Sequence, residues 1–353
     1  MTAFDPDAAA DPDAGLFGLE TSLSEAQAIV IPVGFDATTS YRTGAAAGPE
    51  WIRRASHQVD LHDERWGAVW ERGIASLDSD PRIAELQARA FPRARRVIDA
   101  GGRVAGDPAL EADLAAVDAA GSELNAIVEE HTRSALDAGR LPVVIGGDHS
   151  IPFGAIAAAA DRHPGMGILH VDAHADLRVA FEGFTWSHAS ILHNVLERCP
   201  GVARLLQIGV RDLGAAESQR IASSSDRIST LFDDRWGAAR ASGDDLGTLV
   251  DTALDFLPDE IWITVDVDGL DPALCPNTGT PVPGGLGWNE MMLWLDRIER
   301  SGRRVVGVDL VEVSGGPLGG AQLPPADAPD PWDAIVGARL AYKLIGCALA
   351  TRG

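Results

Sequence analysis

Short apolar runs alternate with longer amphipathic stretches along most of the chain. The apolar runs lie at 28–35, 141–147, 166–174, 205–210, 261–269 and 304–313, and glycine or polar residues bound each of them. Runs of this length that are rich in Val and Ile are typical of strands buried on both faces of a parallel sheet. The stretches 121–139, 187–199, 244–257 and 289–302 have helical spacing. This alternation predicts an α/β fold, a three-layer α-β-α sandwich around a central parallel sheet.

The first 27 residues have a different composition. Ala, Asp, Pro and Gly dominate their beginning, which predicts an acidic, flexible N-terminal arm over residues 1–27. No repeat or linker divides the remainder, so residues 28–353 are expected to form one catalytic domain. The chain start lacks the basic and apolar pattern of a signal peptide, and no run approaches the roughly 18 apolar residues that span a bilayer. We therefore expect a cytoplasmic protein.

Acidic residues greatly outnumber basic ones. Asp and Glu total 52 against 29 Lys and Arg, a formal net charge of −23. Such a surface repels nucleic acid and anionic membranes, which excludes both as expected partners, and it mildly favours a cationic substrate. The three cysteines are far apart in the sequence, so neither a disulfide framework nor a structural zinc site is expected.

Three of the apolar runs end in residues that bind metals. They read VVIGGDHS, ILHVDAHADL and WITVDVDGLDP. Ligands of parallel α/β sheets bind beyond the carboxyl ends of the strands, and residues spaced by two on an extended chain point the same way. The pattern therefore directs one group of side chains to a common point: His149, Asp172, His174, Asp176, Asp266 and Asp268.

Four carboxylates and two imidazoles at one point need a counter-charge, because packing like charges together is destabilising. Two divalent cations would balance the four negative charges, and the imidazoles would complete the coordination as neutral ligands. The sequence therefore predicts a binuclear metal site.

The stretches GGDHS, DAHAD and DVDGLDP resemble, in order and rough spacing, the three signature motifs of the ureohydrolase (arginase/agmatinase) family. Segments 34–56, 279–286 and 307–313 resemble further landmarks of that family, so the similarity runs from about residue 29 to 348. The resemblance implies an arginase-like fold and the non-arginase branch of the family, agmatinase-like or guanidine hydrolase-like.

The resemblance also implies a division of the ligands. One ion would bind His149, Asp172, Asp176 and Asp266, and the other Asp172, His174, Asp266 and Asp268. The family mainly uses Mn²⁺, with Ni²⁺ as the alternative. Asp176 would accept the proton of the attacking water, His188 would carry a proton to the leaving amine, and Glu312 would bind the guanidinium group. By the same analogy, we expect a homo-oligomer, a trimer or hexamer.

The expected reaction is hydrolysis of a linear amidine, in which a guanidino C–N bond breaks to give urea plus an amine or ammonia. A small or alkyl-substituted guanidine is the favoured substrate, with agmatine and guanidinobutyrate as alternatives. Because Arg178 could meet a substrate carboxylate, formimidoylglutamate is a further alternative. Arg178, Trp186 and Glu217 are the further candidates for substrate binding, and Phe181, Phe184 and Trp186 are expected to line an apolar pocket mouth. The competing classes are a non-catalytic metal-binding subunit and a single-zinc deacetylase.

Overall fold

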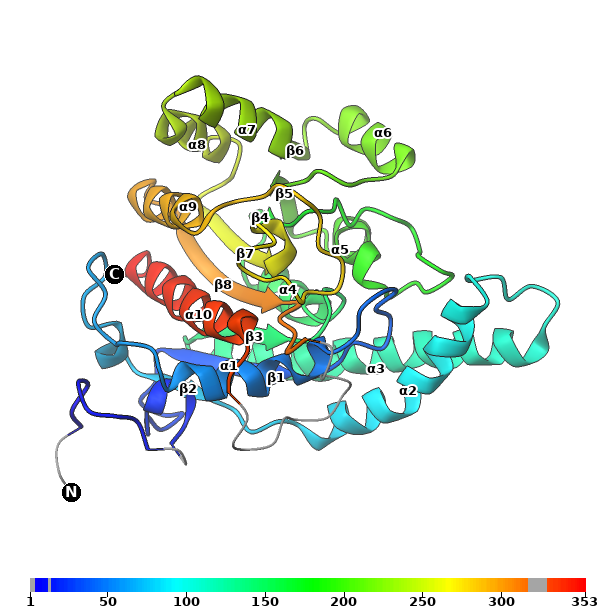
Figure 1. Cartoon of the computed structure of the whole chain (residues 1–353), viewed down its shortest axis with the longest axis horizontal. Helices are drawn as coiled ribbons and strands as arrows, with labels where there is room; N and C mark the ends of the chain where they lie inside the picture. Colours follow the sequence, from blue (N-terminus) through cyan, green and yellow to red (C-terminus); the bar gives the residue numbers. More distant parts are fainter. Residues whose placement is uncertain (1–3, 12–13, 317–328) are drawn as a thin grey trace.

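The computed structural model describes residues 4–11, 14–316 and 329–353, and its centre is a parallel sheet of eight strands in the order β2-β1-β3-β8-β7-β4-β5-β6 (Figure 1). The strands are β1 (Ala28–Val33), β2 (Ile74–Ser76), β3 (Leu141–Gly146), β4 (Met166–Val171), β5 (Val202–Ile208), β6 (Ile228–Leu231), β7 (Glu260–Asp266) and β8 (Arg304–Val311). All six predicted strands are present. The two edge strands, β2 and β6, were not predicted.

Helices cover both faces of the sheet, so the predicted α-β-α sandwich is confirmed. The first core packs α1 (Gly48–Ser56), α8 (Leu246–Leu254), α9 (Trp288–Arg300) and α10 (Trp332–Ala350) against the sheet. The second core holds α2 (Pro81–Asp99), α3 (Pro108–Asp137), α4 (Phe153–Arg162) and α5 (Ile191–Arg198). Helices α6 (Ala215–Ser223) and α7 (Asp233–Ser242) flank β6 in the sequence.

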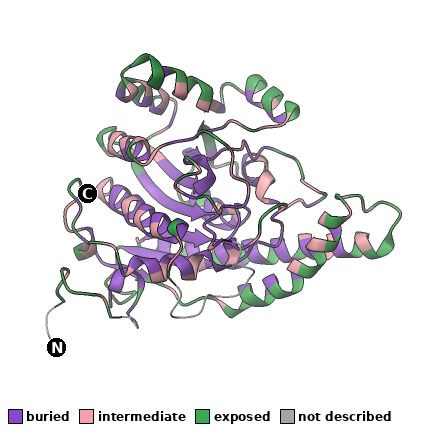
Figure 2. Ribbon diagram, in the orientation of Figure 1, coloured by how far each residue is buried: buried purple, intermediate pink, exposed green. Residues whose placement is uncertain are grey.

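Both faces of the central strands are buried, as Figure 2 shows. In β7, Ile261, Ile263 and Val265 belong to one core, whereas Trp262 points into the other. This alternation explains why the strands are mainly apolar on both faces, since in a parallel sheet neither face meets water.

Helix α3 begins earlier than predicted. The expected helix covered 121–139, with a loop-helix excursion over 101–120, but α3 runs from Pro108 to Asp137. Asp107 caps it by accepting hydrogen bonds from the backbone N–H groups of Ala109 and Leu110, and Pro108 occupies the first turn. An aspartate cap followed by proline is a strong start signal, so the cap rather than the Ala-rich composition sets the helix boundary.

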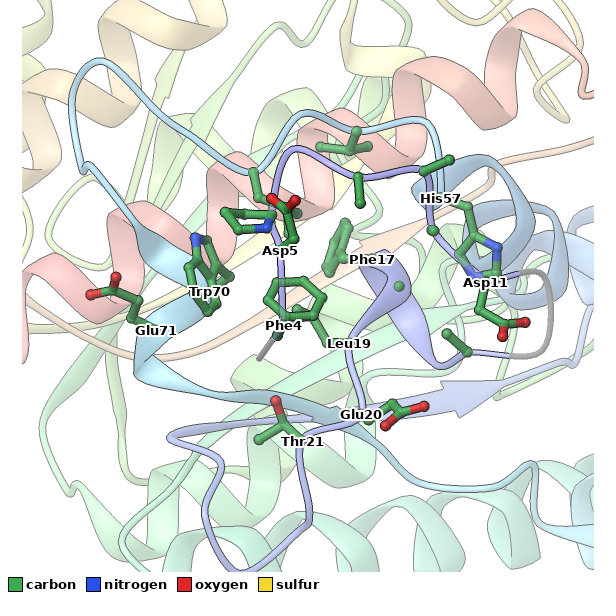
Figure 3. A pocket seen from close by; sticks show the side chains of 18 of the residues that line it. Phe4, Asp5, Asp11, Phe17, Leu19, Glu20, Thr21, His57, Trp70 and Glu71 are labelled. Carbon is green, nitrogen blue, oxygen red and sulfur yellow. The ribbon is translucent and has the colours of Figure 1, made fainter. Parts of the chain in front are cut away.

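The described residues of the N-terminal segment contact the domain. Phe17 is buried, packs edge-on against Tyr342 at a centroid distance of 4.9 Å, and donates its backbone N–H to Ser56 Oγ. A cavity of about 820 Å³ lies between this segment and the region of Trp70, with Phe4 and Phe17 in its wall (Figure 3). Residues 1–3 and 12–13 of the predicted arm lie outside the described residues. The flexibility of the arm and the boundary at residue 28 stay predictions.

Within the described ranges, no helix is both long and apolar enough to cross a membrane.

Candidate metal centre

The order of the strands places the three sequence motifs side by side. Strands β3, β8, β7 and β4 are consecutive neighbours in the sheet, although they begin between residues 141 and 304 of the chain. Because all strands are parallel, their carboxyl ends meet at one edge, where β3 leads to His149, β4 to Asp172, β7 to Asp266 and β8 to Glu312. All four side chains are buried.

The side chains converge by a different route from the expected extended chain. Strand β4 ends at Val171 and β7 at Asp266, and Val267–Gly269 form a 3-10 turn. Each motif turns on its first aspartate: Asp172 Oδ1 accepts the backbone N–H of His174 at 2.6 Å, and Asp266 Oδ1 accepts that of Asp268 at 2.8 Å. Aspartate favours such local turns because its side chain can replace a backbone acceptor. The prediction of extended geometry is wrong, but the predicted convergence is present.

His149 Nδ1 is the centre of the first group of donor atoms. It lies 2.9 Å from Asp172 Oδ2, 3.3 Å from Asp176 Oδ2 and 3.4 Å from Asp266 Oδ2. These are the residues that the sequence assigns to the first ion.

His174 Nδ1 is the centre of the second group, 3.4 Å from Asp172 Oδ1 and 3.2 Å from Asp268 Oδ2. Asp172 thus turns one oxygen toward each imidazole, the orientation of a carboxylate that bridges two ions. The structure therefore brings all six sequence-predicted residues into one cluster.

Two carboxylates of the cluster have raised pKa values, so a bound cation would stabilise their charged forms. Burial and the charge of Asp172 raise the pKa of Asp176 to about 7. Burial and the neighbouring carboxylates Asp268 and Asp172 raise the pKa of Asp266 well above its ordinary value. A buried carboxylate needs a cation or hydrogen-bond donors to stay charged. The donor set of carboxylates and imidazoles suits a binuclear site for divalent metal ions.

A buried chain of hydrogen bonds fixes the ring of His149. Its Nε2 lies 2.8 Å from Thr264 Oγ1, and that hydroxyl donates to Asp309 Oδ1 at 2.7 Å. Trp262 Nε1 also donates to Asp309, at 2.6 Å. Since the Thr264 proton is used on Asp309, Nε2 of His149 is the donor to Thr264, and in the neutral ring Nδ1 presents a lone pair to the cluster.

Glu312 has one carboxylate oxygen engaged and one without a partner. Its Oε1 accepts the backbone N–H of His149 at 3.0 Å, whereas Oε2 is buried and has no hydrogen-bond partner among the described residues. A Cβ atom at Gly279 would lie 3.0 Å from Oε2, so this glycine leaves space in front of the oxygen. Burial and the charge of Asp266 raise the pKa of Glu312 well above its usual range.

His188 begins a short 3-10 turn before α5 and is half-buried. Burial, followed by the charges of His174 and His149, lowers the pKa of its imidazole to about 4. Phe181 meets the ring edge-on at a centroid distance of 6.0 Å. His188 is therefore near enough to the cluster to sense its charge.

The remaining candidates for substrate binding contact other protein groups. Arg178 Nε lies 3.5 Å from Glu217 Oε2, and its guanidinium lies 4.8 Å from the centroid of the Phe181 ring. Glu217 also accepts the backbone N–H groups of Leu177 and Gly214 and caps α6.

Two aromatic residues expected at the pocket mouth pack into the protein. Trp186 Nε1 donates to Ser122 Oγ at 2.9 Å, and its ring packs against Phe153. Phe184 is fully buried in the second core, which corrects its expected place at the pocket mouth, because its apolar ring is covered from both sides.

Sequence reasoning missed the polar residues beneath the cluster. Thr264, Asp309, His170 and Gln207 lie inside strands that are mainly apolar. A polar side chain in an otherwise apolar buried strand is itself a signal, since it needs a partner. The hydrogen-bond partners of these side chains lie on strands that are distant in the sequence, so the sequence alone does not identify them.

Comparison with known proteins agrees with this geometry. The model of the Arginase family matches residues 26–345. The chain is 29% identical to an N(1)-aminopropylagmatine ureohydrolase of Synechocystis over 92% of this chain and 90% of that protein. It is 31% identical to a protein of the same name from Thermus thermophilus, over 82% of this chain and 83% of that protein.

A solved structure has the same fold. The agmatine ureohydrolase of Thermoplasma volcanium superposes with a TM-score of 0.65 at 24% identity, covering 94% of this chain and 92% of that one. The parallel sheet, the His and Asp cluster and the family match lead to one conclusion: the chain belongs to the arginase family.

Proposed function

We propose that this protein hydrolyses a C–N bond of a guanidino compound to release urea plus an amine or ammonia. The observation that carries the proposal is Glu312 Oε2, a buried carboxylate oxygen without a partner beside the cluster of donor atoms. A guanidinium group offers a planar fork of N–H donors that fits a carboxylate. Such a substrate would donate a hydrogen bond to Glu312 Oε2, and its central carbon would then lie near the metal ions.

Each residue of the centre has a role in this reaction. His149, Asp172, Asp176 and Asp266 would hold one ion, and Asp172, His174, Asp266 and Asp268 the other. Two divalent ions, when bound, lower the pKa of water so that it can attack at neutral pH. Asp176 accepts the proton of the attacking water, and His188, whose imidazole is neutral at pH 7 because its pKa is lowered, relays a proton to the departing nitrogen.

The substrate is a cation without an amino-acid head group. Glu217 and the ring of Phe181 already engage the guanidinium of Arg178, so this residue is a poor anchor for a substrate carboxylate. That favours guanidine, alkyl guanidines, agmatine and aminopropylagmatine over formimidoylglutamate. The two relatives named above are both aminopropylagmatine ureohydrolases. Their names support, as substrate, an alkyl guanidine that carries a second amine.

We propose Mn²⁺ as the metal, with Ni²⁺ as the alternative, because carboxylate-rich sites suit Mn²⁺ and two imidazoles also accommodate Ni²⁺. We also propose a homo-oligomer, a trimer or hexamer in the cytoplasm. Light scattering on the purified protein measures the assembly.

The test is urea release from guanidine, methylguanidine, agmatine, aminopropylagmatine, guanidinobutyrate and arginine, and formamide release from formimidoylglutamate, after loading with Mn²⁺ or Ni²⁺ separately. We expect urea from at least one guanidine that lacks a carboxylate, and two metal ions per chain. A single zinc ion per chain, or no product from any of these compounds, would refute the proposal.

A further inference from the structure

A row of polar side chains crosses the sheet one layer below the donor atoms of the centre. Thr230 on β6 is in register with Gln207 on β5, and Gln207 with His170 on β4. His170 in turn is in register with Thr264 on β7, which pairs with Asp309 on β8. Four of the five, all except Thr230, are fully buried. Because buried polar groups are costly unless hydrogen-bonded, the bonds along this row define the state of each member.

The amide of Gln207 has one possible orientation. Its Nε2 lies 2.8 Å from the carbonyl oxygen of Ala175, which can only accept, so this atom is the NH₂ group. On the other side, the hydroxyl of Thr230 donates to Oε1 at 3.1 Å. The second proton of the NH₂ group is directed at His170 Nδ1, at 3.0 Å.

This orientation decides the tautomer of His170. Nδ1 accepts from Gln207, so in the neutral ring the proton is on Nε2. Nε2 lies 2.8 Å from Asp172 Oδ2 and donates to it. By distance alone, His170 groups with His149, Asp172 and Asp176 as a potential metal ligand. A protonated Nε2 cannot bind a metal, so His170 is a donor to the bridging carboxylate instead.

We infer that Gln207 is a positioning residue of the metal centre, which acts through His170 to hold Asp172 in its bridging orientation. One lone pair of Asp172 Oδ2 takes the His170 proton, and the oxygen still faces His149 Nδ1 at 2.9 Å. The other oxygen is fixed by the backbone N–H of His174. The inference rests on the proposed function, because it requires that Asp172 binds metal.

Without the Gln207 donor, the His170 ring can carry its proton on Nδ1 and turn a bare Nε2 toward Asp172. The carboxylate would then lose its donor and face a lone pair. Loss of a group that orients a metal ligand typically lowers metal affinity about 10–100-fold. We expect that range of weakening for the Mn²⁺ that Asp172 binds.

The test uses the full-length protein, stripped of metal and titrated with Mn²⁺ by calorimetry. Gln207→Met removes the donor at similar volume, and Gln207→Leu, which also lacks the donor, replaces it should the first variant not fold. Thr230→Val is the matched control, because it removes a hydrogen bond to Gln207 Oε1 but leaves both amide protons in place. We expect the Gln207 variant to bind Mn²⁺ about 10–100-fold more weakly, and Thr230→Val to bind as wild type does.

A comparison of single and double variants distinguishes the positioning role of Gln207 from a purely structural one. If Gln207 acts through His170, His170→Phe weakens binding to a similar extent, and adding Gln207→Met to it has no further effect. Wild-type affinity in the Gln207 variant, or additive weakening in the double variant, would overturn the inference. If wild-type protein binds no divalent ion at all, the proposed function itself fails, and this outcome is distinguishable from the others.

Discussion

Replacing Glu312 with glutamine tests how the substrate is held. Glu312→Gln keeps the length of the side chain and an acceptor for the backbone N–H of His149, but it removes the charge from Oε2. The side chain is 3% exposed, so water cannot substitute for the lost carboxylate oxygen. The change therefore isolates the charged fork that we propose for the guanidinium group.

The structure sets the scale of the effect. Removing one partner of a buried, hydrogen-bonded charge pair costs about 3–5 kcal/mol. Since about 1.4 kcal/mol corresponds to a tenfold change in rate, kcat/KM should fall by about 10²–10⁴-fold. The free energy of unfolding of the metal-free protein should not decrease, because the lost charge is unpaired and close to Asp266.

The assay is steady-state urea release with the best substrate of the panel, alongside metal content and the melting temperature. Glu260→Gln is the control, since Glu260 begins β7 at the opposite end of the strand, where it contacts His163 and Arg304. A kcat/KM for Glu312→Gln within about tenfold of wild type, with metal content intact, would show that Glu312 does not bind the guanidinium. A large loss accompanied by loss of metal would instead assign it to the metal centre.

The same geometry makes three further predictions. Asp268→Ala should bind one metal ion per chain and lose nearly all turnover, because Asp268 belongs to the His174 group only; elemental analysis that still finds two ions contradicts the ligand assignment. His188→Asn should keep both ions but lose about 10²–10⁴-fold in kcat, the usual contribution of a proton-transfer group, and the loss should shrink for substrates whose leaving amine is less basic. Asp113→Asn should destabilise the protein at pH 7. The pKa of Asp113 is lowered, chiefly by its hydrogen bond to Arg96, so the carboxylate stabilises the fold fully above its unfolded pKa of about 3.9, and this stabilisation is lost progressively as the pH falls from that value through the lower folded pKa; urea unfolding should give a larger difference between variant and wild type at pH 7 than at pH 3.

The sequence predicts the core of this fold better than its edges. The six central strands have mainly apolar runs because both of their faces are buried. Strand β6, by contrast, has a half-exposed Ser229 and Thr230 at its middle, and β2 has three residues, so neither produces a strong pattern. The edge strands thus depend on neighbours in the sheet rather than on their own composition.

The sequence predicted the candidate metal ligands because their residue types and spacing are unusual. It did not predict the residues that hydrogen-bond to those ligands from the strands below. His149 and Asp172 belong to short local motifs, and the charge argument needs no knowledge of strand order. The partnership of Gln207 with His170 depends on β5 lying beside β4, and that of Thr264 with Asp309 on β7 lying beside β8. Register between strands separated by helices is a tertiary property, which no local pattern contains.

The backbone of the centre carries strain that the surrounding structure must maintain. Asp176 and Glu312 are two of the four non-glycine residues with positive φ among the described residues, at 53° and 64°. Left-handed backbone costs a residue with a side chain about 1–3 kcal/mol. Glycine would avoid this cost, but a glycine at 176 or 312 would remove a carboxylate that the proposed reaction needs.

Neighbouring hydrogen bonds oppose that strain. The carbonyl of Asp176 accepts the N–H groups of Leu192 and His193, and the N–H of Glu312 donates to the carbonyl of Gly147 at 2.9 Å. The first contact ties the loop after β4 to the start of α5, and the second ties the end of β8 to the turn after β3. The carboxylates are therefore held in place before any ion or substrate arrives, so binding need not reorganise them. Preorganised groups of this kind stabilise developing charge most effectively, which is why the fold tolerates strain where it has chemistry to perform.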